Sequence, residues 1–244
     1  MKSDILEIME WDSKFFGKKT ARVAEEIILD KDNETKLLAE IKNEKFETIY
    51  YWQGSSLTEN LKGLYRLGFE LIDIEVILEK RLAKYEKNVD EHLIDLTKIK
   101  NSQTLKQLYM LAQKLSQKSR FWRDVKTRFR VEEMYRIWIK RFIGGTDKGW
   151  CYGLKINNKV ISMAIFQDEG EEKVVLKLVA VEDDFRGRGW GRKMMDSSLV
   201  KLAADGIGEV AVVTQLSNII AVKFYLGCGF ELKSARYIFH WHRR

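Results

Sequence analysis

The chain has 244 residues, of which 45% are hydrophobic and 32% are charged, and its formal net charge is +7. This composition is typical of a folded protein with one large domain or two small ones and argues against a disordered chain. No apolar segment reaches the roughly 18 residues that a membrane-spanning helix needs, and the first residues lack the pattern of a signal peptide. We therefore expect a cytoplasmic protein without a membrane partner.

The numbers of cysteine, histidine and charged residues limit the kinds of ligand-binding site that this chain can form. Two cysteines, Cys151 and Cys228, are too few and too distant for a disulfide framework or a structural zinc site, so we expect them to be reduced and buried. His240 and His242 share a strand face, but three histidines in the whole chain provide no third ligand, and we expect no metal. The excess of 43 Lys and Arg over 36 Asp and Glu favours small phosphorylated ligands, and no long basic stretch indicates a nucleic-acid partner.

The first part of the chain alternates short apolar runs with helical periodicity. The predicted strands and helices are strands at 5–9, 20–24, 48–52 and 69–80, and helices at 35–42 and 57–67. Gly68 ends the second of these helices. This order predicts a βαβ-like first half.

The second part begins with two predicted helices and continues into a meander of strands. The helices at 101–118 and 131–143 are joined by an unusual link at 119–130 that mixes aromatic and basic residues. Strands separated by turns are expected between Gly149 and Val181. The remaining predicted elements are a helix at 190–204, a strand at 210–215, a helix at 218–227 and a strand at 229–240.

A glycine-rich turn, F-R-G-R-G-W-G at 185–191, connects a predicted buried strand to a helix. The unpaired N–H groups at the start of a helix attract anions, and a pyrophosphate is the simplest candidate. The spacing differs from the dinucleotide-binding G-x-G-x-x-G pattern, and no Walker lysine is present. Basic residues within eight positions strengthen the prediction: Arg186, Arg188, Arg192 and Lys193. A glycine-rich turn that holds no ligand is the alternative.

Two motifs in this half resemble those of a known superfamily. R-G-R-G-W-G resembles the Q/R-x-x-G-x-G/A signature of the GNAT superfamily of N-acetyltransferases, and N-I-I-A-V-K-F-Y-L-G-C-G-F-E-L at 218–232 resembles its second block. Glu182 and Asp183 stand where a proline-containing pair is common, which affects turn geometry more than chemistry. The resemblance covers residues 149–240.

The superfamily resemblance implies a fold and a donor. The expected fold is α+β, with a central mixed, mostly antiparallel sheet flanked by helices. We expect a smaller N-terminal α/β acceptor-side domain at 1–92 and a GNAT acetyltransferase domain at 93–244. The implied cofactor is acetyl-CoA, and the residues implied to bind it are Val179, Ala180, Val181, Arg186, Gly187, Arg188, Gly189, Trp190, Gly191, Arg192 and Asn218.

Within this set, the resemblance gives some residues particular roles. The backbone of Val179 and Val181 is expected to pair with the pantetheine arm as an added strand would. Asn218 either reaches the cofactor or caps its helix. Tyr225 occupies the position of the family's proton donor. A phenol with an ordinary pKa of about 10 stays protonated at neutral pH and can donate to a thiolate. Its alternative role is to pack the helix against the sheet.

Five shorter blocks spread over both halves resemble the TDP-fucosamine acetyltransferases, which acetylate the 4-amino group of a dTDP-linked 4-amino-4,6-dideoxy sugar. The blocks are residues 10–17, 67–76, 119–121, 135–139 and 214–218. The residues expected to bind this nucleotide-linked amino sugar are Trp11, Phe15, Phe16, Gly17, Arg120 and Phe121. Core packing or a solvated surface is the alternative for each.

Asp73 and Glu75 lie on the strand face opposite Ile72, Ile74 and Val76, so either carboxylate could accept the proton of the sugar amine. The resemblance favours Glu75 as the base, because the matching family segment has an acidic residue there, and a charged residue on a wet strand face is the alternative. The expected function is therefore an acetyl-CoA-dependent N-acetyltransferase of a nucleotide-linked amino sugar, compatible with a homodimer. Two other functions fit the sequence: acetylation of another small amine or a protein N-terminus, and a regulatory module that binds acyl-CoA. The glycine-rich turn and Tyr225 argue against the regulatory module.

Overall fold

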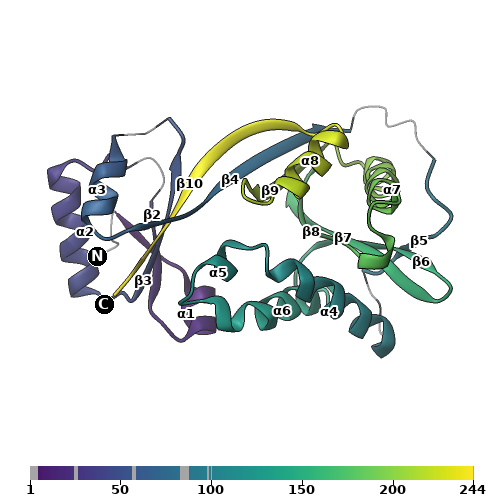
Figure 1. Ribbon diagram of the computed structural model, residues 1–244, viewed down its shortest axis with the longest axis horizontal. Coiled ribbons are helices and arrows are strands. Elements are labelled where there is room, and N and C mark those ends of the chain that lie inside the picture. The colour runs from purple at the N-terminus through teal and green to yellow at the C-terminus, as the bar shows by residue number, and fades with distance from the viewer. Residues whose placement is uncertain are drawn as a thin grey trace. The chain divides into compact units, whose positions relative to one another are not determined.

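A computed structural model describes residues 5–24, 27–56, 59–82, 88–97, 99 and 101–243 (Figure 1). The chain divides into two compact units, one comprising Met1–Val76 with Ser234–Arg244 and the other comprising Ile77–Lys233. Two long strands, β4 (Glu70–Arg81) and β10 (Glu231–His242), contribute residues to both units. Among the described residues, no helix has the length and apolar character needed to cross a membrane.

The first unit is a small α/β fold. Its other elements are β1 (Leu6–Ile8), α1 (Glu10–Phe16), β2 (Thr20–Val23), α2 (Lys31–Asn43), β3 (Thr48–Gly54) and α3 (Asn60–Arg66). β2 and β3 are parallel, whereas β1 pairs with β2, and β3 with β10, in antiparallel register. Leu37, Ile49 and Phe239 are fully buried in the core that the helices form with this sheet. The N- and C-terminal ends of the chain both belong to this unit.

Glycines end two helices of the first unit. Gly17 follows α1 with φ +66°, and Gly68 follows α3 with φ +84°. These left-handed conformations favour glycine and stop a helix abruptly, so that the chain turns at once into the next strand.

The second unit is larger and contains both superfamily motifs. Its elements besides β4 and β10 are β5 (Leu93–Asp95), α4 (Ser102–Ser116), α5 (Arg120–Arg123), the 3₁₀ turns η1 (Arg128–Arg130) and η2 (Asp183–Phe185), α6 (Val131–Ile143), β6 (Gly149–Ile156), β7 (Lys159–Gly170), β8 (Lys173–Val181), α7 (Trp190–Ala204), β9 (Glu209–Gln215) and α8 (Ile219–Gly227). The strand order is β4-β9-β8-β7-β6-β5. Strands β5 to β8 pair antiparallel, and β8 and β9 are parallel.

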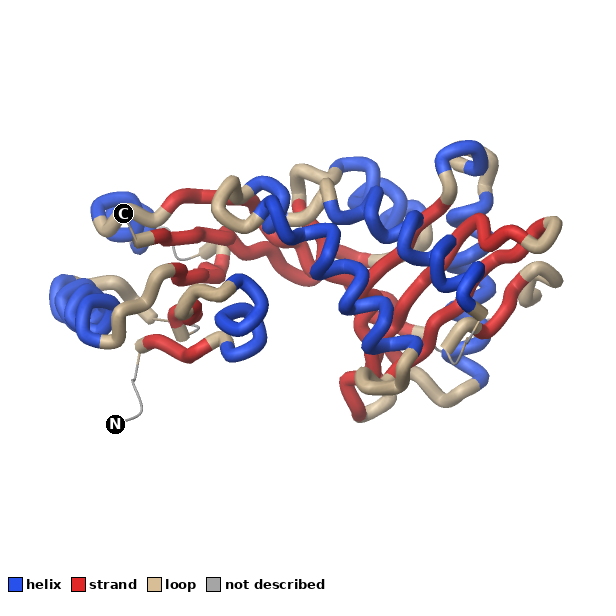
Figure 2. The backbone as a smooth tube through the Cα atoms, turned by 90° about the horizontal axis from the view of Figure 1, so that it is seen from below, coloured by secondary structure: helices blue, strands red, loops and turns tan. Residues whose placement is uncertain are grey.

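Helices cover both faces of this sheet. The amphipathic helices α4 and α6 pack together on one face, where Leu108, Leu111, Met134 and Ile139 are almost fully buried. Helix α7 packs on the opposite face through β6, β7 and β8, as Figures 1 and 2 show. The expected mixed, mostly antiparallel sheet flanked by helices is confirmed.

The structure adds elements to the predicted ones. The block at 10–17 forms a complete helix, α1, that ends at Gly17. The aromatic and basic link at 119–130 contains the short helix α5 and the turn η1. The division of the chain into acceptor-side and acetyltransferase domains at residue 92 stays a prediction, because it concerns the role of each half. Cys151 and Cys228 are free and buried.

Candidate active site

The turn that enters α7 presents six consecutive main-chain N–H groups that meet no hydrogen-bond acceptor among the residues described. They belong to Gly187, Arg188, Gly189, Trp190, Gly191 and Arg192. Gly187 and Gly189 adopt φ values of +71° and +82°, a conformation that costs a residue with a Cβ roughly 1–2 kcal/mol. Because these amides carry the positive end of the helix dipole, the turn is suited to a phosphate group.

The three arginines of this turn differ in their partners. Arg186 donates from Nε to the carbonyl of Val181 at 3.1 Å and pairs with Asp183 at 2.8 Å. Arg192 donates to the carbonyl of Gly227 and contacts Asp196. Arg188 is exposed and pairs with none of the described residues. Of the three guanidinium groups in this turn, that of Arg188 can therefore bind a phosphate without breaking a contact with another described residue.

Trp190 begins α7 inside a small cluster of aromatic and charged side chains. The ammonium of Lys193 lies 4.6 Å from its ring centroid, and His92 and Phe185 contact it edge-on at 5.9 and 6.3 Å. Asp90 accepts hydrogen bonds from His92, and Lys193 lies 3.4 Å away. Although burial alone would raise it, these partners hold the pKa of Asp90 below its ordinary value. The cluster fixes the segment before β5 against the start of α7.

The parallel strands β8 and β9 part halfway along their length. Their pairing ends at Leu176 and Val212, although β8 continues to Val181 and β9 to Gln215. The backbone of the last residues of β8 therefore has no neighbouring strand on the β9 side.

The register of β8 shows which backbone groups face this opening. The N–H of Glu182 donates to the carbonyl of Ile161 at 2.8 Å, and Val181 lies opposite Ser162. In an antiparallel ladder, hydrogen-bonded and non-bonded positions alternate. Val179 and Val181 therefore direct their N–H and C=O groups away from β7 and toward the opening. Ala180, between them, bonds toward β7 and has a buried side chain.

Tyr225 lies on α8 with 6% of its surface exposed. The rings of Phe224 and Phe230 lie 5.4 and 5.9 Å from it. Burial, and then the proximity of Cys228 and Tyr135, raises the pKa of this phenol well above its ordinary value. The group therefore stays protonated across the neutral range, as a proton donor must.

A second buried tyrosine connects this phenol to the link before α6. Burial raises the pKa of Tyr135 to about 12, while Ser119 and the charge of Arg120 act in the opposite direction. The Arg120 guanidinium lies over the ring of Phe121 at 3.9 Å. Arg120, Phe121, Tyr135 and Tyr225 thus belong to one neighbourhood of the second unit.

Asn218 caps α8. Its side chain accepts a hydrogen bond from the N–H of Ala221 at 3.4 Å, which is a structural role. Asn218 also lines a pocket, so capping and ligand contact are compatible.

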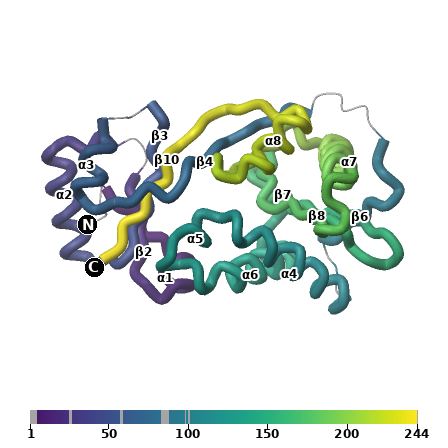
Figure 3. Tube along the Cα trace, in the orientation of Figure 1, coloured from purple at the N-terminus to yellow at the C-terminus, as the bar shows by residue number. Residues whose placement is uncertain are grey.

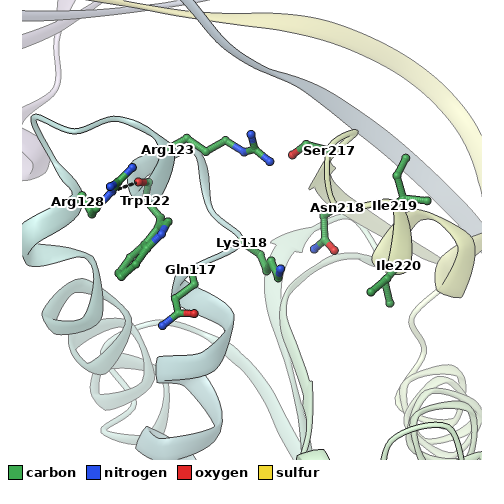
Figure 4. Close-up of a pocket in the computed structure, with 9 residues that line it drawn as sticks. All are labelled: Gln117, Lys118, Trp122, Arg123, Arg128, Ser217, Asn218, Ile219 and Ile220. Carbon is green, nitrogen blue, oxygen red and sulfur yellow. Dashed lines mark hydrogen bonds between the residues drawn. The ribbon is translucent and has the colours of Figure 1, made fainter.

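This pocket, of about 350 Å³, opens between the link after α4 and the start of α8 (Figure 4). Its lining residues are Gln117, Lys118, Trp122, Arg123, Arg128, Ser217, Asn218, Ile219 and Ile220. Figure 4 shows Arg123 extending from α5 toward Ser217. Arg128 donates from Nε to the carbonyl of Trp122 at 2.6 Å and lies 5.7 Å from the Trp122 ring. Three cations and one indole around a pocket of this size suit an anionic ligand with a flat ring.

Glu75, the predicted base, lies on β4 in the first unit and is 7% exposed. Its Oε1 accepts hydrogen bonds from Nε and Nη2 of Arg236 on β10, at 3.0 and 2.5 Å. Glu75 is therefore held as part of an ion pair and does not lie on a wet strand face.

The predicted N-terminal aromatic residues also belong to the first unit. Trp11 stacks on Phe15 at 4.9 Å with 11° between the ring planes, and Phe16 packs edge-on against Phe15. Phe15 and Phe16 are buried, so helix packing accounts for most of their surface. Gly17 has no side chain within 4 Å of an added Cβ, and its positive φ is explained by the end of α1.

Several candidate residues were not predicted from the sequence. Trp122, Arg123 and Arg128 lie in the link at 119–130, whose mixture of aromatic and basic residues was identified as unusual, but only Arg120 and Phe121 of that link were named as ligand contacts. Tyr135 begins the block at 135–139 but was given no role, and Arg236 had no local signal, because its partner Glu75 lies far away in the chain.

Comparison with known proteins relates the sequence of this chain to a family. Residues 114–230 match the Acetyltransferase (GNAT) family. A dTDP-fucosamine acetyltransferase from Escherichia coli O6:H1 is 26% identical over 235 residues, which span 95% of this chain and 96% of the relative.

Solved structures agree on the fold. A GCN5-related N-acetyltransferase from Sphaerobacter thermophilus superposes with a TM-score of 0.65 at 12% identity, covering 97% of this chain and 76% of that chain. A functionally unknown conserved protein from Staphylococcus epidermidis gives a TM-score of 0.64 at 12% identity, over 100% of this chain and 93% of that chain. The family match shows that residues 114–230 form a GNAT acetyltransferase domain, and together with the relative it supports an acetyl-CoA-dependent N-acetyltransferase activity.

Proposed function

We propose that this acetyltransferase acetylates the 4-amino group of a dTDP-linked 4-amino-4,6-dideoxy sugar. The observation that carries the acceptor assignment is the match to the dTDP-fucosamine acetyltransferase along nearly the full length of both chains, including the first unit, which the GNAT family match does not cover. A cytoplasmic location and a homodimer stay predictions.

The donor half of the proposal uses the turn into α7 and the end of β8. The six unpaired amides at 187–192 would hold the pyrophosphate, with Arg188 as the available cation. The N–H and C=O groups of Val179 and Val181 would pair with the amides of pantetheine. For the Val181 carbonyl, this pairing competes with the hydrogen bond from Arg186.

Acetyl-CoA supplies the activated acetyl group as a thioester. The chain's own residues move the protons. The phenol oxygen of Tyr225 donates a proton to the departing sulfur, and the raised pKa keeps that proton in place until then. The carboxylate of Glu75 accepts the proton that the amine loses, while Arg236 fixes its Oε1.

The acceptor half of the proposal uses the pocket at the start of α8. Lys118, Arg123 and Arg128 give it a positive field that suits the diphosphate of a nucleotide sugar. Trp122 provides a flat apolar surface for a base or a sugar. Arg120 and Phe121, predicted to bind the acceptor, lie in the same link.

The test measures thiol release from acetyl-CoA with three acceptors: dTDP-4-amino-4,6-dideoxygalactose, the same amino sugar without its nucleotide, and a panel of amino acids and polyamines. We expect the highest kcat/KM with the dTDP-sugar. Thiol release that is as fast with a panel amine, or absent with the dTDP-sugar, would refute the acceptor assignment and leave a GNAT acetyltransferase of another amine.

A further inference from the structure

The helix that carries Tyr225 is in contact with the turn that enters α7. An added Cβ on Gly191 would lie 3.2 Å from the ring of Phe224, so the absence of a side chain lets the two elements approach closely. Phe224 directly precedes Tyr225. The two helices lie next to one another in the trace of Figure 3.

A second contact comes from the residue after Gly191. Nη1 of Arg192 donates a hydrogen bond to the carbonyl of Gly227, the last residue of α8. The Nε of the same guanidinium lies 3.3 Å from Oδ2 of Asp196, one turn later on α7. Carbonyls in the last turn of a helix have no partner within the helix, so a cation there both satisfies the oxygen and complements the helix dipole.

A second cation acts at the same end of α8. Nζ of Lys80, on β4, donates to the carbonyl of Cys228 at 2.6 Å. Gly229 has φ +81°, and a Cβ there would lie 2.8 Å from this ammonium. The end of α8 is thus fixed from two sides, by β4 through Lys80 and by the turn into α7 through Arg192.

We propose that Arg192 is a positioning residue, whose side chain holds the end of α8, and with it the phenol of Tyr225, in register with the donor-binding turn. The proposal rests on the proposed function and changes one part of it. The sequence predicted Arg192 as a cofactor-binding residue, whereas its guanidinium is committed to Gly227 and Asp196, which leaves its main-chain N–H for the donor.

The two roles for the Arg192 side chain predict different kinetics. A phosphate ligand contributes to donor binding, so Arg192→Gln would raise the Kd for acetyl-CoA with little change in kcat at saturation. A positioning residue acts on the transition state through Tyr225. In that case Arg192→Gln lowers kcat about tenfold or more and changes the Kd for acetyl-CoA less than about threefold. Arg192→Lys keeps a donor within reach of Gly227 and recovers part of the rate.

A donor without phosphates separates the roles further. S-acetylpantetheine lacks both the pyrophosphate and the 3′-phosphate of acetyl-CoA. We expect Arg192→Gln to slow turnover of this donor by the same factor as that of acetyl-CoA. Equal rates for the variant and the unmodified protein with S-acetylpantetheine would overturn the proposal and make Arg192 a phosphate ligand.

A measurement without turnover keeps this test independent of the acceptor assignment. Hydrogen exchange of the amides at 224–230 should accelerate about tenfold in Arg192→Gln, because the end of α8 loses one of the two cations that bind its carbonyls. Unchanged exchange there would overturn the proposal whatever the substrate. Arg22→Gln is the matched control, since Arg22 also pairs with one carboxylate, Glu7, at a comparable exposure; it should change neither exchange at 224–230 nor kcat.

Discussion

Glu75 accepts two hydrogen bonds from Arg236 at Oε1, one from Nε and one from Nη2, so the guanidinium orients the carboxylate. Glu75→Gln keeps an oxygen for Arg236 but removes the base. We expect kcat to fall about 100-fold, within the range for loss of a general base. Steady-state thiol release at saturating acetyl-CoA measures it. Glu79→Gln is the control, because Glu79 lies on the same strand and pairs with Lys233 at 3.1 Å. Similar rates for the two variants would contradict the assignment of the base.

Tyr225→Phe removes the proposed acid and keeps the buried ring. We expect kcat to fall about 100-fold or more, with the Kd for acetyl-CoA within about twofold of its original value. Isothermal titration gives the Kd and thiol release gives kcat. Tyr152→Phe, in another buried tyrosine of the second unit, should leave both values nearly unchanged. A Tyr225→Phe enzyme of normal kcat would show that the tyrosine only packs α8.

The pH dependence should follow from the direction of the Tyr225 shift. An acid works only while it is protonated, and burial raises the pKa of this phenol above the ordinary value. Loss of the proton is therefore displaced to a pH above the roughly 10 of a free phenol. We expect kcat to show no descending limb between pH 7 and about 9.5. A descending limb near pH 8 in the unmodified protein, absent from Tyr225→Phe, would contradict the raised pKa.

Gly189 tests the donor turn. Gly189→Ala forces a side chain into φ +82° without a steric clash, since no atom lies within 4 Å of the added Cβ. Its strain should weaken acetyl-CoA binding about tenfold by moving the amides of the turn. Gly206→Ala is the matched control, because Gly206 has φ +88° and equally open surroundings at the other end of α7. Both variants should lose about 1 kcal/mol of folding stability, and only Gly189→Ala should change the Kd for acetyl-CoA.

The cations that line the pocket should contribute to the binding of an acceptor that carries a diphosphate and not to the binding of an acceptor without one. Lys118→Gln and Arg123→Gln are each expected to raise KM for the dTDP-sugar about tenfold to a hundredfold, because a charge-assisted hydrogen bond to a phosphate is worth roughly 1.5–3 kcal/mol when made. KM for the amino sugar without its nucleotide should not change. Lys106→Gln, in an exposed lysine of α4, provides the control. An equal rise in KM for both acceptors would place the diphosphate elsewhere.

The parts of the site that the sequence predicted are those whose cause is local. The glycines at 187 and 189 and the helix start at 190 follow from backbone conformation, and the α8 block carries its own cap and tyrosine. The contacts between distant residues were not predictable, because no local pattern pairs Arg192 with Gly227 or Glu75 with Arg236. Similarly, the pocket combines the segments 117–128 and 217–220, about a hundred residues apart.

The secondary structure was likewise predicted well where its cause is local and poorly where it depends on distant residues. Long periodic segments such as α4 and α6, predicted at 101–118 and 131–143, were predicted close to their observed bounds. The three-residue strand β5 was missed, since its conformation is set by pairing with β6 rather than by its own sequence. Residues 10–17 were interpreted through their aromatic side chains as ligand contacts, whereas their backbone forms α1 and buries Phe15 and Phe16.

The separation of β8 from β9 also has a consequence for the stability of the protein, which should depend on the concentration of the acetyl donor. Without a neighbour, the backbone at Val179 and Val181 forms an internal sheet edge, and a bound pantetheine would complete it. A ligand that binds only the folded chain adds RT ln(1 + [L]/Kd) to its stability, about 2.7 kcal/mol at a hundred times Kd. The melting temperature and protease resistance of this enzyme should therefore rise with acetyl-CoA concentration. A cell with little acetyl-CoA would then also contain less of the intact protein.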